Sequence, residues 1–152
     1  MKLDNLIETL KKETSTKPIG SIADVINALE EFEAGAVFVH EANISDTEKI
    51  AKVQAFARET FIEIYPSIHA LAPEKTEALL DTVLAKNADY GDSFGNLVRK
   101  YGDVAMSIRI SDKLSRLKSL TSGNKQQVKD ESITDTSVDA AGYALLATAF
   151  QA

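Results

Sequence analysis

Cysteine and tryptophan are absent from this sequence of 152 residues, which also holds only 3 prolines. Without cysteine the fold can use neither disulfides nor thiolate metal ligands, as is common in the cytoplasm. No apolar run approaches the roughly 18 residues of a membrane-spanning helix. The first residues alternate charged and apolar side chains, unlike a signal peptide. We therefore expect a cytoplasmic protein without a membrane segment.

The chain also has no excess of positive charge: its formal net charge is −6 and its pI is about 4.9. Such a chain has no overall field that attracts nucleic acid or an anionic membrane, so direct binding of either is not expected. Hydrophobic residues make up 44% of the chain, which is enough for one buried core. We predict a single domain over residues 1–152.

Apolar residues recur at helical spacing along most of the chain, and no stretch alternates with the period of a strand. The sequence therefore predicts an all-α antiparallel bundle of about five to six helices, with a short additional helix over 93–100. The Tyr65-Pro66 step is expected to end the third helix. In the segment 103–120, we expect Val104, Ile108 and Leu114 on the buried side. The longer helices are expected over 2–13, 21–41, 45–65, 73–87, 103–120 and from about 128 onwards.

Three acids near the C-terminus stand four residues apart, and in a helix they share one face. They are Glu131, Asp135 and Asp139, and no basic residue follows Glu131. Because three carboxylates in a row repel one another, something positive must face them. Either a divalent metal or cations of the preceding helix could do so, and the sequence leaves both open.

The preceding helix carries a cationic row with a single aspartate at i, i+3, i+4 and i+7, formed by Arg109, Asp112, Lys113 and Arg116. Antiparallel packing would bring this row near the acids, an arrangement that suits phosphate and metal together. Oxygen ligands favour Mg²⁺ or Mn²⁺ over zinc, with Asp112 as a further ligand. A structural network of ion pairs is the alternative interpretation.

The segment KNADYGDSF, residues 86–94, gathers a cation, acids and aromatic rings between two predicted helices. Lys86 and Asp89 could contact a nucleotide, and Tyr90 or Phe94 could stack on its base. The alternative is a helix terminator whose aromatic rings fill the core. No P-loop or dinucleotide-binding glycine pattern is present.

Three blocks, KNADYGDSF, YGDVAMSIRISDKLSRLKSL and VKDESITDTSVDAAGYALL, occur here in this order. Together they resemble the family called nucleotide modification associated domain 1, found in phages and prophages. The resemblance covers about residues 80–150, whereas 1–75 resemble no family. It implies a helical protein connected with the modification of nucleotides or DNA bases.

The helix with Glu131, Asp135 and Asp139 is also distantly similar to the metal-binding helices of MazG-like all-α nucleoside triphosphate pyrophosphohydrolases. Those enzymes carry EExxE followed by ExxD, whereas this chain has ExxxD at residue 131 and EExE at residue 30. The resemblance implies a nucleotide-binding protein that hydrolyses nucleoside triphosphates with Mg²⁺.

In that interpretation the three acids are catalytic and hold the metal, while Lys86, Arg109, Lys113 and Arg116 take the phosphates. The alternative is a non-enzymatic phage protein that sequesters a nucleotide or blocks a protein partner. The amphipathic helices are also compatible with a homodimer.

Overall fold

The computed structural model of the protein consists of seven packed α-helices, and the residues that it describes form no strand. It describes residues 3–122 and 131–152, and the side chains of 5–122 and 133–152. The all-α prediction is confirmed, and the short helix predicted over 93–100 is present as α5. The helices are α1 (Leu3–Thr14), α2 (Ile22–Glu41), α3 (Asp46–Leu71), α4 (Pro73–Asp89), α5 (Ser93–Tyr101), α6 (Val104–Thr121) and α7 (Glu131–Ala149).

Local capping groups explain where several helices begin. The backbone N–H of Ser21 donates to the Asp24 carboxylate at 2.7 Å before α2. Before α3, the Ser45 hydroxyl accepts from the N–H of Glu48 at 3.2 Å. Pro73 occupies the first turn of α4, where its missing N–H costs no helical hydrogen bond. These starts were predictable because each signal lies within a few residues of the helix end.

Helix α3 continues through Pro66, so the predicted end at this residue was wrong. A proline in a helix interior costs about 3 kcal/mol because it removes a hydrogen bond and crowds the preceding turn. The following turn is buried, with Ser67 and Ile68 exposed by only 9% and 0%. The Ser67 hydroxyl also accepts from the N–H of Gly20 at 2.8 Å. We attribute the continuation to this packing, which local propensity does not reveal.

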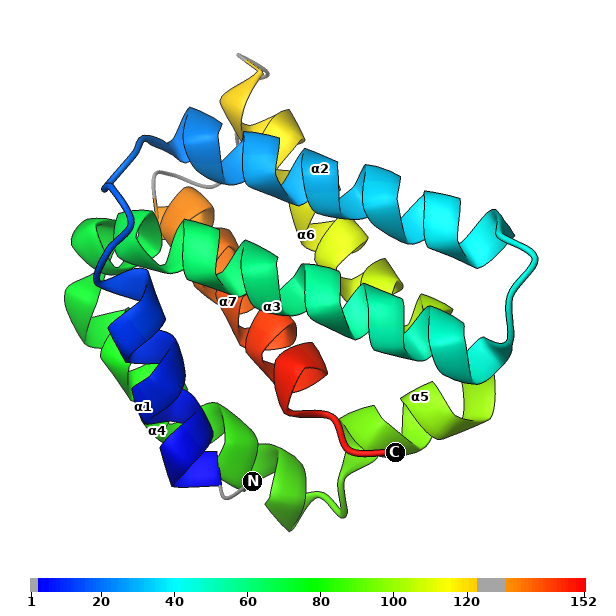
Figure 1. Cartoon of the computed structure of the whole chain (residues 1–152). Helices are drawn as coiled ribbons and strands as arrows, with labels where there is room; N and C mark the ends of the chain where they lie inside the picture. The colour runs from blue at the N-terminus through cyan, green and yellow to red at the C-terminus, as the bar shows by residue number, and fades with distance from the viewer. Residues whose placement is uncertain (1–2, 123–130) are drawn as a thin grey trace.

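Helix α7 is the central element of the bundle and packs against α3, α4 and α6 (Figure 1). Its buried side consists mainly of small residues, which let the neighbouring helices come close. A Cβ added to Gly142 would lie 3.2 Å from the side chain of Leu79 in α4. The fully buried alanines are Ala140, Ala141, Ala144 and Ala147.

The C-terminal end of α7 is held by a side chain of α3. Gln54 Nε2 lies 3.0 Å from the carbonyl oxygen of Ala147, 3.1 Å from that of Thr148 and 2.8 Å from that of Phe150. The carbonyls at a helix end lack partners within the helix, so this amide takes the place of a local cap.

Helix α6 buries Met106, Ile110, Leu114 and Leu117. Ile108, which the sequence predicted to be buried, is 58% exposed. The prediction was wrong for Ile108 and is confirmed for Leu114, which is 2% exposed. The apolar core extends through all seven helices. None of the helices in the described part of the chain combines the length and apolar content that crossing a membrane would need.

Candidate functional site

The exposed side of α7 carries a row of polar residues that we call the α7 strip, formed by Asp135, Asp139 and Tyr143. They are spaced by four residues and therefore lie on one face of the helix. The side chains of Asp135 and Asp139 are 53% and 52% exposed. Since α3 covers another side of α7, the strip lies between the flanking helices α4 and α6.

Each of the two aspartates is paired with a lysine from a different flanking helix. Lys75 Nζ of α4 lies 2.7 Å from Asp135 Oδ1. Lys113 Nζ of α6 lies 3.6 Å from Asp139 Oδ2. The predicted contact between the cationic row and the acidic row is thus made by Lys113, whereas Asp135 meets a lysine outside that row.

Arg109 and Lys113 also lie beside the aromatic ring of the strip. The Arg109 guanidinium carbon and Lys113 Nζ are each 5.9 Å from the centre of the Tyr143 ring. Both distances are within the range of cation–π attraction. Cations, carboxylates and a partly buried aromatic ring therefore meet on one face, and nucleotide sites use groups of these kinds.

The remaining members of the predicted site are more dispersed. Glu131 begins α7, but its side chain lies outside the described residues. Asp112 is 75% exposed, with its carboxylate 3.9 Å from Lys113 Nζ. Arg116 is exposed and makes no ion pair with any residue that the structure describes. Among the described side chains, no group of three or more His, Asp or Glu is arranged to hold a metal ion.

The donor set of the strip nevertheless fits a hard divalent cation that arrives with a phosphate ligand. Mg²⁺ in nucleotide sites is commonly held by one or two carboxylates, with phosphate oxygens and waters completing the octahedron. Asp135 and Asp139 supply two such carboxylates one turn apart. Both are occupied by lysines, so a metal would have to displace Lys75 and Lys113 from them.

The loop between α4 and α5 is organised by the side chain of Asp92, which has a left-handed φ of 57°. Its carboxylate accepts from Asn87 Nδ2 at 2.9 Å, from the N–H of Gly95 at 3.2 Å and from Arg99 Nη1 at 3.0 Å. Asn87 in turn accepts from the N–H of Phe94 at 3.0 Å. The loop is therefore fixed by its own hydrogen bonds.

These contacts also set the protonation of Asp92. Burial by itself would raise the pKa of Asp92, but the hydrogen bonds from Asn87, Arg99 and Gly95, together with the charge of Arg99, lower the pKa below its ordinary value. Asp92 therefore stays ionised when the solution is moderately acidic.

The predicted ligand-binding residues of the segment 86–94 lie at the end of α4, in the loop and at the start of α5, and they are divided between surface and core. Lys86 and Asp89 are exposed, and the Tyr90 side chain is 77% exposed. Phe94 is only 8% exposed and belongs to the apolar core. Tyr90 is thus the aromatic residue of this loop that an incoming base can reach.

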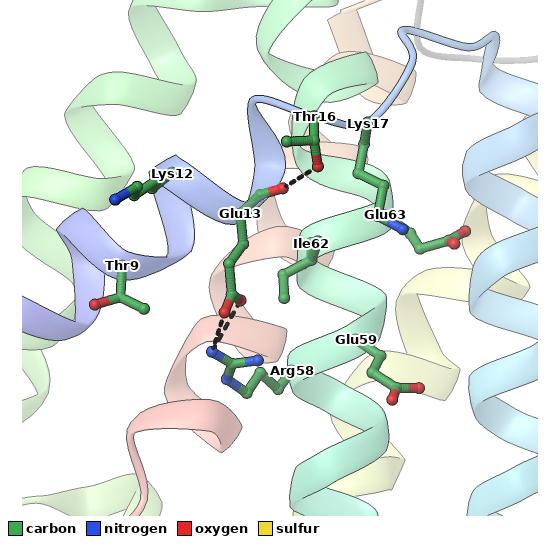
Figure 2. Close-up of a pocket in the computed structure, with 9 residues that line it drawn as sticks. All are labelled: Thr9, Lys12, Glu13, Thr16, Lys17, Arg58, Glu59, Ile62 and Glu63. Carbon is green, nitrogen blue, oxygen red and sulfur yellow. Dashed lines mark hydrogen bonds and ion pairs between the residues drawn. The ribbon is translucent and has the colours of Figure 1, made fainter.

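A separate groove of about 880 Å³ lies between α1 and α3 (Figure 2). Figure 2 shows Arg58 pointing towards Glu13, and the two side chains form an ion pair of 2.8 Å. The other lining charges include Lys12, Lys17 and Glu63. None of the residues that line this groove is aromatic, so it offers a nucleotide base no ring to stack on, whereas the strip has Tyr143.

Two residues of the strip region were missed from the sequence. Tyr143 follows Asp139 by four residues, so extending the acidic row by one turn would have found it. Lys75 lies 60 residues before Asp135, and only the crossing of α4 over α7 brings the two together. No local pattern in the sequence indicates that crossing.

The fold and the strip define an all-α protein with a paired-charge surface on its central helix. Residues 86–149 match the family model described as nucleotide modification associated domain 1. The matched part contains α5, α6, α7 and the end of α4, and thus every residue of the strip. No curated protein and no solved structure matches the chain. Residues 86–149 are therefore similar to a domain associated with nucleotide modification.

Proposed function

We propose that the protein binds a nucleotide together with Mg²⁺ on the α7 strip and hydrolyses nucleoside triphosphates to monophosphate and pyrophosphate. The observation that carries this proposal is the contact of Lys113 with Asp139 and of Lys113 and Arg109 with Tyr143, one turn along α7 from Asp135. The match of this region to a domain associated with nucleotide modification supports the same ligand class.

Each group of the strip has a role that follows from its chemistry. Lys113 and Arg109 bind phosphate oxygens, Arg109 through paired N–H donors. Lys86 and Arg116 are exposed cations, and we assign them to the phosphates as well. Tyr143, or Tyr90 from the α4–α5 loop, stacks on the base.

Asp135 and Asp139 hold Mg²⁺ in this proposal, with Glu131 and Asp112 as further ligands. When bound, the metal (Mn²⁺ could substitute) neutralises phosphate charge and favours deprotonation of a water. In the reaction, water oxygen forms a bond to the α-phosphorus while the bond from that phosphorus to the bridging oxygen breaks. Pyrophosphate leaves with the bond electrons, and the water proton passes to solvent or a carboxylate. Lys113 and Arg109 stabilise the charge that develops on the phosphoryl oxygens.

The direct test is calorimetric titration of the metal-free protein with each common ribo- and deoxynucleoside triphosphate, with and without Mg²⁺, followed by chromatography of the products. We expect binding of at least one nucleotide, and release of monophosphate and pyrophosphate only when Mg²⁺ is present. Absence of both binding and turnover across all the nucleotides would refute the proposal.

A second function is favoured by one specific observation, namely that a lysine already pairs with each described carboxylate of the strip. In this alternative the protein is not an enzyme: it sequesters a nucleotide or blocks a protein partner. The double substitution Asp135→Asn with Asp139→Asn separates the two functions. Loss of turnover in a folded variant supports the enzyme, whereas general destabilisation supports a structural network.

The biological setting that we infer is phage or prophage nucleotide metabolism, or the modification of DNA bases. In phage-infected cells that lack the protein, we expect the nucleotide pool to differ from that of infected cells that contain it. Chromatography of the two cell extracts measures the difference. A homodimer also remains a prediction, which sedimentation of the purified protein would test.

A further inference from the structure

The two lysine–aspartate pairs of the α7 strip have a consequence for the order in which ligands can bind. Lys75 comes from α4 and Lys113 from α6, so the pairs approach the strip from opposite sides of α7. Lys75 lies outside the residues that match the family model.

The exposure of these pairs makes an exchange of partners possible. The side chains of Lys75 and Asp135 are 48% and 53% exposed, and that of Asp139 is 52% exposed, whereas its partner Lys113 is 20% exposed. Ion pairs in such surroundings contribute little to folding, so breaking them does not endanger the fold. A lysine is also a compact charge on a flexible stem, which can turn from one anion to another.

The charges of the strip oppose each ligand when it comes alone. A divalent cation meets two lysines beside the carboxylates that it needs, and a nucleotide meets two carboxylates beside the lysines that it needs. When both ligands are present, the lysines can move to the phosphates while the carboxylates turn to the metal. Each ligand then draws away the charges that repel the other ligand. Binding of one therefore raises the affinity for the other, which is positive coupling between two sites.

We propose that Lys75 and Lys113 are exchange residues, which hold Asp135 and Asp139 in the free protein and transfer to nucleotide phosphates on binding. The free protein consequently has a weak site for divalent metal, and the nucleotide completes it. This inference rests on the proposed function, adds Lys75 to the phosphate-binding residues, and states how the metal site is controlled.

The test uses Mn²⁺ as a paramagnetic probe and measures its binding to the full-length protein by electron paramagnetic resonance, without nucleotide. Lys75→Met and Lys113→Met remove the charge but keep most of the side-chain length. We expect each variant to bind Mn²⁺ about tenfold more tightly than the unaltered protein, because one repelling charge is gone and one carboxylate is released. Circular dichroism verifies that each variant is folded.

The same variants are then titrated with the nucleoside triphosphate that the unaltered protein binds, in the presence of Mg²⁺. Here we expect affinity to fall about tenfold, because a phosphate contact is lost. The opposite signs of the two effects distinguish exchange from a structural role, which would weaken both kinds of binding. Lys118→Met is the matched control, because Lys118 also belongs to α6 but pairs with Glu30 of α2 at 3.3 Å.

Unchanged or weaker Mn²⁺ binding in both folded lysine variants would overturn the inference, even if the unaltered protein binds nucleotide. Failure of the unaltered protein to bind any nucleotide would instead remove the proposed function and the inference with it. An equal effect of Lys118→Met would show that net charge, rather than the strip, controls Mn²⁺ binding and would likewise overturn the inference.

Discussion

Asp103 is a charged residue buried at the start of α6, where its side chain is 6% exposed. His40 of α2 faces it, with Nδ1 3.1 Å from Asp103 Oδ2 and 3.4 Å from Oδ1. Burial of a carboxylate is costly unless it has a hydrogen-bond partner. The contact therefore ties the C-terminal end of α2 to the beginning of α6.

We expect His40→Ala to lower the free energy of unfolding by about 1–3 kcal/mol, because the buried carboxylate loses its described partner. Urea denaturation at neutral pH measures the change. His69→Ala is the control: His69 lies at the same distance of 3.1 Å from Glu77, but that carboxylate is 64% exposed. Water can replace this partner, so the loss should stay below about 1 kcal/mol. Equal losses in the two variants would contradict the prediction.

Asp92 gives a prediction that depends on pH. Because the folded protein lowers the pKa of Asp92, its ionised form stabilises the fold above the ordinary aspartate pKa of about 4. That contribution is lost as the pH falls through the lowered pKa. Asp92→Asn tolerates the left-handed backbone, and it removes the charge together with one of the two acceptor oxygens. We expect the variant to have a lower urea midpoint at pH 7, and the difference to shrink towards pH 3.

Asp89→Asn is the matched control for this experiment, since Asp89 belongs to the same loop region but is exposed. Its side chain makes no hydrogen bond with the described residues, so its urea midpoint should follow that of the unaltered protein at every pH. A pH-independent difference for Asp92→Asn would mean that shape rather than charge is responsible.

At the scale of the helices, the close packing of α7 should make its small residues sensitive to added volume. Ala144 is 0% exposed on a helix surrounded by α3, α4 and α6. Ala144→Leu should lower the free energy of unfolding by about 1–3 kcal/mol, because overpacking forces neighbouring side chains to move. Ala85→Leu on the exposed side of α4 makes the same change without a neighbour to displace. Thermal and urea denaturation compare the two, and similar stabilities would argue against tight packing around α7.

The sequence revealed those helical features that depend on nearby residues. Capping at Ser21 and Ser45 and the break at Gly102 were predictable, because each signal lies beside the feature it controls. Continuation through Pro66 and exposure of Ile108 were not, since both depend on what the neighbouring helices cover. Prediction was therefore reliable for helix starts and less so for the face each helix buries.

The same distinction holds for the candidate site, where contacts set by local spacing were predictable and contacts set by the crossing of distant helices were not. A spacing of four residues correctly predicted that Asp135 and Asp139 share a face, and antiparallel packing predicted the approach of Lys113. The pairing of Asp135 with Lys75 depends on a crossing of α4 and α7 that no spacing encodes. Gly95 lies inside α5, where an added Cβ would meet the Asp92 carboxylate, and no local pattern in the sequence indicates that close approach.

At the scale of the whole molecule, the part that matches the family model depends on the part that does not. Helix α7 packs extensively against α3, and Val53, Ala57 and Phe61 of α3 belong to the same core as α7. We expect a fragment of residues 86–152 to lack cooperative unfolding and to show far less helix by circular dichroism than its share of the whole chain. The loss follows from exposure of the apolar side of α7.

The full-length protein under the same conditions is the reference. A mixture of the full-length protein with an excess of the fragment tests whether the fragment itself disturbs the measured unfolding. A fragment that melts cooperatively, with native helix content, would show that residues 86–149 fold independently. It would also contradict the prediction of a single domain over residues 1–152.

Gln54 is a residue whose slow deamidation would weaken the C-terminal end of α7. Its amide nitrogen faces the carbonyl oxygens of Ala147, Thr148 and Phe150. Slow deamidation would turn that donor into a carboxylate and set negative charge against three oxygens and the negative end of the helix dipole. In a stored sample, the last turn of α7 would then unfold first. A mass increase in the peptide that contains Gln54 would measure the extent of deamidation.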